Sequence, residues 1–571
     1  MTLAKFKSKL FSVFYANSPL LVRVLSRLLY RELIERFVAP YSNSFFPLRQ
    51  NGGSYFKTSM RFGKDLQGRY FSQYYNEPHV NDLIINPLDT MQYKSETLQG
   101  RCLEKSSSQS VKFSSGGLLP LSIPNRVMNN VQNDKTWVEI KIGKTTQKLR
   151  NLVQNRFYYF PIADACTVQI SSQYELIIGN PFYFRQKYRN RKKLVLCVFV
   201  DGLASEAFKL QPLKTLMPYS FKFFESGLIV PESNSCTDWT VPSVASIMSG
   251  LYPKNHRFVN AKSNHAGSDF KIISQIFQDN GYLTSQFCSN YGKTPAMGYA
   301  QGFDRTIYGR SLTVDNLMSS MFDHLKTFPD RDHFIWLSAF DLHHFQNIVP
   351  SIDVQASLPL IYHDYQYQKV KSVIGAYNRN RAERFCSELK RVDHQLNRLY
   401  EFVSKNYSDE DVTLCLFSDH GQPYFTNEKE LFSKQRSIIP FFIKDTMFNH
   451  GVQECNLSNV DILPTLLTCT GVNSDGISLD GVSVLGHEKR LGRLFSFMES
   501  IYPGKPYQAC IVDDTHRFHF KTVHCVDGNS LINTEEYEIY LENGFSGDIE
   551  TDKFPEKTEK FLRYVLNHLH K

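Results

Sequence analysis

The sequence lacks both a regular cysteine framework and a long hydrophobic run. Its 11 cysteines follow no repeated spacing, which favours a reducing compartment over a disulfide-bonded secreted fold. A membrane-spanning helix needs roughly 20 consecutive apolar residues, and the longest uncharged stretch near the N-terminus falls well short of that. No signal peptide is recognisable either. Together these absences predict a cytoplasmic protein.

Extreme charge is also absent. The formal net charge of +9 is modest for 571 residues, so it fits an anionic substrate or membrane surface and gives no indication of nucleic acid binding. Residues 20–29 place leucine and valine on one face of a predicted basic helix that includes Arg23, Arg27 and Arg31. Such a helix could contact a membrane peripherally, or it could pack its leucine face on the protein itself.

The length predicts more than one domain, and 42% hydrophobic residues indicate packed cores. Residues 1–115 give no chemical motif and are expected to form a partly helical extension, in which residues 105–117 have the composition of a linker. Residues 116–190 contain short runs of alternating apolar and polar positions. This pattern predicts a small β-rich module that either binds carbohydrate or serves as a structural appendage.

Further along the chain, two apolar runs each end in a carboxylate. Residues 193–200 and 412–417 are predominantly apolar and do not alternate with polar positions, which is typical of parallel strands buried on both faces. Asp201 follows the first run, and Asp419 and His420 follow the second. Because ligands bind at the carboxyl edge of such sheets, we expect these polar side chains to share one edge.

A hydroxyl stands before a predicted helix of small residues between these two strands. Thr240 precedes residues 244–248, which suit close helix packing, and Gly250 ends the helix. The N-terminus of a helix offers unpaired N–H groups and the positive end of the dipole, which favour a bound anion and a deprotonated oxygen. Alternatively, Thr240 serves merely as the N-cap.

Asp201, Thr240, Asp419 and His420 together offer hard oxygen and nitrogen ligands. Such a set suits one divalent cation, whether Mn²⁺, Zn²⁺, Mg²⁺ or Ca²⁺. Each motif alone has an ordinary structural explanation, because Asp-Gly is commonly a turn and Asp-His a helix cap. Their joint occurrence after two buried strands favours the metal site.

Five motifs resemble the sulfatase branch of the alkaline phosphatase superfamily. In chain order they are Asp201-Gly202, Thr240-Val-Pro-Ser243, Gly250-Leu-Tyr-Pro-Lys-Asn-His256, Ser418-Asp-His-Gly421 and Val460-Asp-Ile-Leu-Pro-Thr-Leu-Leu467. The resemblance implies an alkaline-phosphatase-like, mostly parallel α/β sheet flanked by helices over residues 191–490. It also implies a small antiparallel α+β subdomain over residues 491–571. The corresponding activity is that of a metal-dependent esterase or transferase with a covalent intermediate on Thr240.

The resemblance extends to weaker positions. Asp341-Leu-His343-His344 resembles the family's Asp-x-His-x-Pro, which makes His343 the candidate that contacts substrate or protonates the leaving group. An insertion of one residue would give that role to His344, and both could instead be ordinary surface histidines. Asp341, together with His343 or His344, could also bind a second ion, and Asp341 and His344 are further candidates for contact with substrate. Lys429 falls near a family lysine that contacts the transferring group.

Thr240 departs from the sulfatases themselves. They mature Cys or Ser within Cys-x-Pro-x-Arg to an aldehyde hydrate, whereas threonine cannot form that aldehyde and Val244 replaces the arginine. An unmodified threonine resembles the nucleophile of the phosphodiesterase, phosphoethanolamine-transferase and glycerol-phosphate-transferase branches. We therefore expect phosphoryl transfer from an anionic ester, such as a glycan or a lipid-linked phosphoester. A sulfatase without the modified residue and a non-catalytic glycan-binding member are the alternatives.

Overall fold

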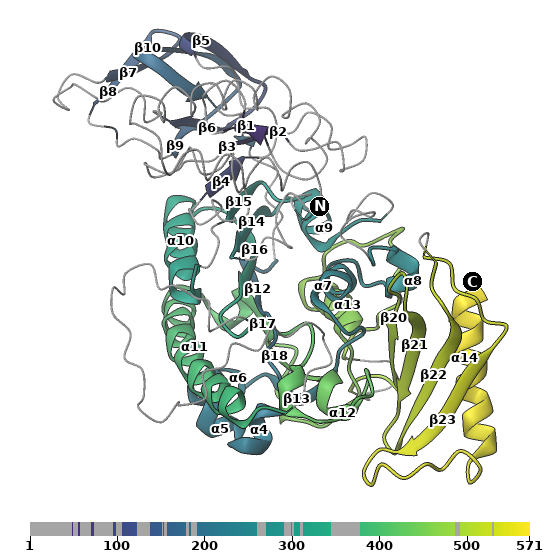
Figure 1. Cartoon of the computed structure of the whole chain (residues 1–571). Helices are drawn as coiled ribbons and strands as arrows, with labels where there is room; N and C mark the ends of the chain where they lie inside the picture. Colours follow the sequence, from purple (N-terminus) through teal and green to yellow (C-terminus); the bar gives the residue numbers. More distant parts are fainter. Residues whose placement is uncertain are drawn as a thin grey trace, which may run out of the picture.

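The computed structural model describes most of the chain beyond residue 191 and parts of it before. The described ranges are 48–49, 55–57, 70–72, 95–98, 106–122, 137–150, 152, 157–178, 182–183, 191–259, 270–289, 299, 302–308, 312–343, 377–485, 491–527 and 530–570. Figure 1 shows a β-rich region, a central α/β region and a C-terminal sheet backed by one helix. The predicted basic helix at residues 20–31 lies outside the described residues.

A nine-stranded sheet forms the centre of the molecule, in the order β19-β13-β18-β17-β12-β16-β14-β15-β4. β18 runs antiparallel to both of its neighbours and β4 runs antiparallel to β15, while the other pairs are parallel. The mostly parallel sheet expected from the sequence is thereby confirmed. The strands are β4 (Ser95–Leu98), β12 (Leu194–Val200), β13 (Leu228–Asn234), β14 (Leu283–Cys288), β15 (Arg305–Tyr308), β16 (His333–Ala339), β17 (Val412–Phe417), β18 (Ile438–Lys444) and β19 (Gly451–Val452).

Helices cover both faces of this sheet (Figure 1). One face carries α10 and α11, and the opposite face carries α7, α9 and α13. The helices are α4 (Ala207–Leu210), α5 (Leu213–Leu216), α6 (Pro218–Phe224), α7 (Thr240–Ser249), α8 (Pro253–His256), α9 (Ile273–Asp279), α10 (Val314–Thr327), α11 (Arg379–Asn406), α12 (Lys434–Ser437), α13 (Ile462–Thr470) and the 3₁₀ turns η8 (Asp409–Asp411), η9 (Pro423–Phe425) and η10 (Asn459–Asp461).

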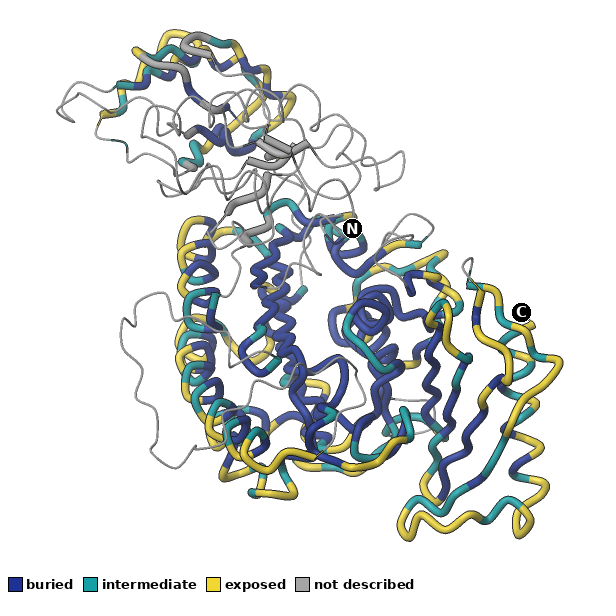
Figure 2. The backbone as a smooth tube through the Cα atoms, viewed as in Figure 1, coloured by how far each residue is buried: buried dark blue, intermediate teal, exposed yellow. Residues whose placement is uncertain are grey.

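Because helices cover both faces of the sheet, the strands formed from residues 193–200 and 412–417 are apolar on both sides. In β12, Leu194 and Leu196 face the core under α10 and α11, whereas Val195 and Cys197 face the core under α7, α9 and α13. Every residue of β12 and of β17 is buried, and Figure 2 shows the buried colour running through the central strands. A strand with two covered faces has no position that favours a polar side chain.

The N-terminal β-rich region is a seven-stranded sheet around one small core. Sequence composition predicted a linker at residues 105–117, and that prediction is wrong. β5 occupies this stretch, pairs with β10, and buries Val111 and Phe113, because its serines join the ladder through backbone groups that any residue supplies. The strands are β5 (Ser106–Phe113), β6 (Gly117–Ser122), β7 (Trp137–Ile142), β8 (Thr145–Arg150), β9 (Phe157–Ile162), β10 (Cys166–Ile178) and β11 (Phe182–Tyr183). A separate three-stranded sheet contains β1 (Leu48–Arg49), β2 (Tyr55–Lys57) and β3 (Tyr70–Ser72).

The C-terminal subdomain is an antiparallel sheet with strand order β20-β21-β22-β23, as the sequence predicted. Phe518 of β22 packs against Phe561 of the closing helix α14. The elements are β20 (Ser496–Ser500), β21 (Pro506–Val512), β22 (His516–Cys525), β23 (Tyr537–Asn543) and α14 (Pro555–His570). Among the described residues, no helix combines the length and apolarity needed to cross a bilayer.

Candidate active site

Asp201 and Asp419 leave the central sheet at the same edge. β12 and β17 are parallel neighbours that pair Phe199 with Phe417, so both carboxylates follow the carboxyl ends of adjacent strands. Both are fully buried. The backbone N–H of Gly202 donates to Asp419 Oδ1 at 3.0 Å, which joins the two strand ends directly. Asp419 Oδ2 is also buried and accepts no hydrogen bond within the described part of the chain.

The imidazole of His420 has a defined tautomer. Its Nδ1 lies 2.8 Å from the carbonyl oxygen of Gly421, which can only accept, so Nδ1 carries the proton. The lone pair of Nε2 therefore points at its other neighbours, Thr240 Oγ1 at 3.0 Å and Asp419 Oδ2 at 3.4 Å. A histidine that donates one ring N–H to a backbone carbonyl and presents the other nitrogen is the usual arrangement of a metal ligand.

Thr240 is the first residue of α7, and its hydroxyl faces His420. The N-cap position belongs to Trp239, whose backbone is extended. The alternative that Thr240 serves merely as the N-cap is therefore wrong. The helix runs from Thr240 to Ser249 and ends at Gly250, which has a φ of 69°. The hydroxyl thus lies at the positive end of a ten-residue helix.

Three side chains form a group that could hold a cation. One ligand atom each from Asp201, His343 and His420 lies within 4.8 Å of the others. His343 Nε2 is 3.8 Å from Asp201 Oδ1, and the His343 ring stacks on Phe340 at a centroid distance of 4.5 Å. One carboxylate and two imidazoles, with the buried Oδ2 of Asp419 beside them, match the ligand chemistry of Zn²⁺ or Mn²⁺.

The structure thus brings the predicted ligands together. Thr240 and Asp419 lie beside the imidazole of His420, and Asp201 and His343 form a group with it. The sequence made His343 a candidate for contact with substrate or the leaving group, or for a second ion. In the structure it lies close enough to Asp201 and His420 to be one of three side chains that could hold a cation.

Asp341 lies apart from this group. Its carboxylate accepts hydrogen bonds from the backbone N–H of Val314 at 3.1 and 3.2 Å and forms an ion pair with Arg391 of α11. Burial raises its pKa to about 6, although Arg391 opposes the shift. Asp341 therefore fixes the start of α10 against α11, and its contacts give no support to a second ion.

Two further predicted residues are placed differently. Lys429 lies in the loop after η9 with its side chain exposed, and its contact with the transferring group stays a prediction. His344 lies outside the described residues.

Sequence reasoning missed the contacts of the C-terminal subdomain with residues 235–239, which connect β13 to α7 and are called the nucleophile loop because they precede the proposed nucleophile Thr240. Asp238 stands two residues before Thr240, and burial raises its pKa while a hydrogen bond with Ser500 of β20 opposes that shift. Beside it, the ring of Trp239 meets that of Tyr502 edge-on at 5.9 Å. A carboxylate so near the proposed nucleophile was visible in the sequence, but its partner lies some 260 positions away along the chain and no local motif indicates it.

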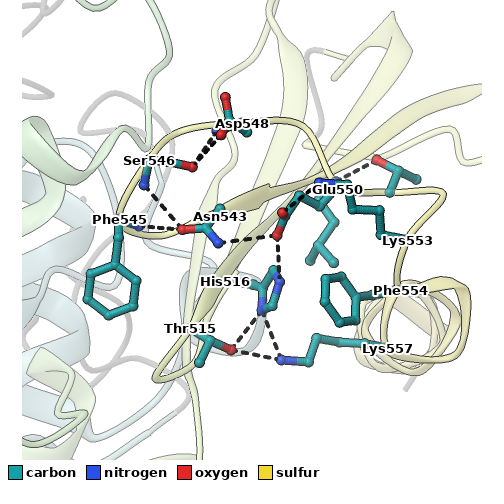
Figure 3. Close-up of polar contacts among 12 residues, drawn as sticks. Thr515, His516, Asn543, Phe545, Ser546, Asp548, Glu550, Lys553, Phe554 and Lys557 are labelled. Carbon is teal, nitrogen blue, oxygen red and sulfur yellow. Dashed lines mark hydrogen bonds and ion pairs between the residues drawn. The ribbon is translucent and has the colours of Figure 1, made fainter.

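Two histidines of the C-terminal subdomain, His516 and His519, have structural roles. His516 Nε2 lies 3.2 Å from Glu550, and its Nδ1 lies 3.1 Å from Lys557 Nζ, so that it links β22 to α14 (Figure 3). His519 Nε2 lies 3.1 Å from Glu542.

The fold and the site together define an α/β protein with a threonine hydroxyl at a helix N-terminus beside a group of side chains that could hold a cation. Residues 193–472 match the family model named Sulfatase. These residues, a little under half of the chain, therefore form a Sulfatase domain, and over them the chain resembles the sulfatase-like branch of the alkaline phosphatase superfamily. Members of this superfamily are generally metal-dependent hydrolases, in agreement with the group around Asp201.

Solved structures support the fold assignment. The sulfatase-assigned protein yidJ from Bacteroides fragilis superimposes with a TM-score of 0.52 at 13% identity, over 68% of this chain and 97% of that chain. The phosphonate monoester hydrolase of Agrobacterium radiobacter does so with a TM-score of 0.50 at 15% identity, over 66% and 95%. No curated protein matches the chain.

Proposed function

We propose that this protein transfers the phosphoryl group of a phosphoester through a covalent intermediate on Thr240, as a divalent-metal-dependent hydrolase or transferase. The observation that carries the proposal is the position of Thr240 Oγ1. It lies at the N-terminus of α7 and 3.0 Å from His420 Nε2, which is itself one of the three clustered cation ligands. Threonine is also the unmodified nucleophile type, because it cannot mature to the aldehyde of the sulfatases.

Asp201, His343 and His420 would hold the cation, with Asp419 Oδ2 as a further donor. A bound divalent cation lowers the pKa of a nearby hydroxyl and stabilises negative charge on the ester oxygens. The N-terminus of α7 acts in the same direction through its unpaired N–H groups.

The reaction then has two balanced steps. Thr240 loses its hydroxyl proton, its oxygen bonds to phosphorus, and the bond from phosphorus to the leaving oxygen breaks as that oxygen takes up a proton. In the second step, water or a sugar hydroxyl attacks phosphorus, and the bond to Thr240 breaks with return of the proton. Water as acceptor gives a hydrolase, and a sugar or lipid hydroxyl gives a transferase.

The test compares the wild type with Thr240→Ala and Thr240→Ser on an aryl phosphodiester, a phosphomonoester and a sulfate ester, each with Mn²⁺, Mg²⁺ or Zn²⁺. Removing the nucleophile is expected to lower kcat by about 10⁴-fold or more, whereas serine retains part of the activity. Mass spectrometry of the quenched wild type is expected to find the phosphoryl group on the peptide that contains Thr240.

A sulfatase without the modified residue is the second candidate, because the matching family model is that of the sulfatases. Faster turnover of the sulfate ester than of either phosphate ester would establish it in place of the first. Absence of both turnover and bound metal would instead favour a glycan-binding member without catalysis. A glycan or lipid-linked substrate, peripheral membrane contact and a cytoplasmic location stay predictions from the sequence.

A further inference from the structure

Asn459, in the 3₁₀ turn η10, joins the nucleophile loop to the metal-binding strand end. Its side chain is buried, with 1% of its surface exposed. Its Oδ1 accepts a hydrogen bond from the backbone N–H of Cys236 at 2.9 Å. Its Nδ2 donates to Ser243 Oγ at 2.8 Å and to the carbonyl oxygen of Asp419 at 3.0 Å.

The carbonyl of Asp419 is the centre of this network. It also accepts hydrogen bonds from Ser243 Oγ at 2.9 Å and from Ser235 Oγ at 2.6 Å. Ser235 precedes the loop that leads to Thr240, and Ser243 lies in the first turn of α7. The backbone of Asp419 is therefore tied to the nucleophile segment on both sides of Thr240, while its carboxylate faces the cation-holding group.

The amide of asparagine is the group that these neighbours require. Cys236 presents a donor, whereas the carbonyl of Asp419 presents an acceptor. A neutral amide meets both at once, since it offers one oxygen acceptor and two N–H donors. The same contacts fix which way round the amide lies.

We propose that Asn459 is a positioning residue that sets the distance between Thr240 and the cation ligands Asp419 and His420. This inference rests on the proposed function and deepens it. Asn459 touches neither the reacting hydroxyl nor a ligand side chain, so it acts through the backbone of Asp419 and through Ser243. Small displacements of a nucleophile relative to its activating group are costly, which makes such a brace consequential for rate.

The test measures kcat, KM and the Kd for Mn²⁺ in the full-length protein, with Asn459→Ala, Ser243→Ala and the double variant. Thr465→Val is the matched control. It lies in the adjacent helix α13, is equally buried, and would lose hydrogen bonds to Asp461 and Val484 rather than to residues of α7 or β17. Both Asn459→Ala and Ser243→Ala are expected to raise the Kd for Mn²⁺ and to lower kcat by about 10- to 100-fold, with little change in KM.

The double-variant cycle identifies the coupling. Asn459→Ala and Ser243→Ala are expected to be non-additive in kcat because they remove one shared contact, whereas Asn459→Ala and Thr465→Val are expected to be additive. Ser243→Ala also keeps the test valid if Asn459→Ala fails to fold, since it leaves only a small cavity. If both Asn459→Ala and Ser243→Ala lower the melting temperature as Thr465→Val does but leave kcat and the Kd for Mn²⁺ unchanged, the positioning role is refuted and the proposed function stands. A wild type that neither binds Mn²⁺ nor turns over any ester would overturn both.

Discussion

At the scale of single residues, the candidate site depends on positions where few residue types fit. Gly202 illustrates this at the turn after β12. Its φ of 73° lies in the left-handed region, and its N–H donates to Asp419 Oδ1. Its carbonyl accepts a hydrogen bond from Gln422 Nε2 at 3.1 Å. A Cβ at this position would lie 2.0 Å from that same Nε2. The glycine is therefore favoured by its left-handed backbone, and a side chain there would also displace the Gln422 amide from its hydrogen bond.

Gly202→Ala is expected to lower metal affinity and kcat by about 10- to 100-fold, because the displaced turn would move both Asp201 and Asp419. The matched control is Gly476→Ala, whose φ of 75° is nearly the same but whose added Cβ would meet no atom within 4 Å. Backbone strain alone should cost both variants about 1–3 kcal/mol of stability. Metal titration and kinetics of the two variants separate the effects, and equal activity in both would contradict a role for the turn in the site.

At the scale of elements, the sequence predicted best where one local pattern determines the structure. The predicted strands at residues 193–200 and 412–417 correspond to β12 and β17, and their predicted ends differ from the observed ends by at most one residue. β10 was less predictable, because it is one long strand whose pairing with β5 shifts register between Ser171 and Leu176. Such a bulge is set by pairing partners, which local periodicity does not contain.

The candidate site was predictable in part for the same reason. Asp201, Thr240, Asp419 and His420 each stand at the end of an element, so topology alone brings them together. The pairing of Asp341 with Arg391 and the entry of His343 into the cation group depend on α10, α11 and the loop after β16 in three dimensions. Asn459 stood directly before a recognised motif, yet a buried amide is identifiable as a brace only when its neighbours are known.

A buried ion pair links β12 to β18 at the end of these strands opposite the candidate site. Lys192, two residues before β12, lies 3.0 Å from Asp445, directly after β18, and the Asp445 side chain is fully buried. Thr413 of β17 also donates to this carboxylate. Lys193 next to it forms a 2.9 Å pair with Asp411, but its own side chain is 60% exposed.

Lys192→Met is expected to cost about 3–5 kcal/mol of unfolding free energy, because it leaves a buried carboxylate without its partner. Lys193→Met is expected to cost less than about 1 kcal/mol, since exposed pairs are screened by water. Urea denaturation measures both, and kcat should be unchanged in each because the pair lies at the edge opposite the site. Equal losses in the two variants would contradict the assignment of Asp445 as a buried anion that needs its lysine.

At the scale of the whole molecule, the C-terminal subdomain is hydrogen-bonded to the segment that carries Thr240. Glu499 of β20 is buried, its N–H donates to the carbonyl of Cys236 at 3.0 Å, and its carboxylate accepts from the N–H of Lys254 at 2.7 Å. Its second oxygen accepts from Tyr507 at 2.9 Å and lies 3.2 Å from His568 Nε2. The His568 imidazole holds the pKa of Glu499 below its usual value despite burial. The nucleophile loop is thus braced by η10 on one side and by β20 on the other.

Three buried histidines in separate parts of the fold should govern its stability in acid. Burial lowers the pKa of His256 to about 3 and that of His333 to about 4, and it lowers the pKa of His324 well below its usual value. Each ring is kept neutral mainly by its burial. Phe258 N–H donates to His256 Nδ1 at 2.9 Å, so the opposite Nε2–H donates to Ser246.

The sign of the pH dependence follows from proton binding. Below pH 6.5 the unfolded chain protonates these imidazoles while the folded protein does not, so the free energy of unfolding falls as the pH drops from 6.5 toward 3. His256→Gln removes one such group and is expected to reduce the slope by up to about 1.4 kcal/mol per pH unit in that window. Urea denaturation of wild type and variant at several pH values between 7 and 4 measures it. An unchanged slope would mean that His256 takes up its proton in the folded state and that its contacts with Ser246 and Phe258 do not exclude the charge.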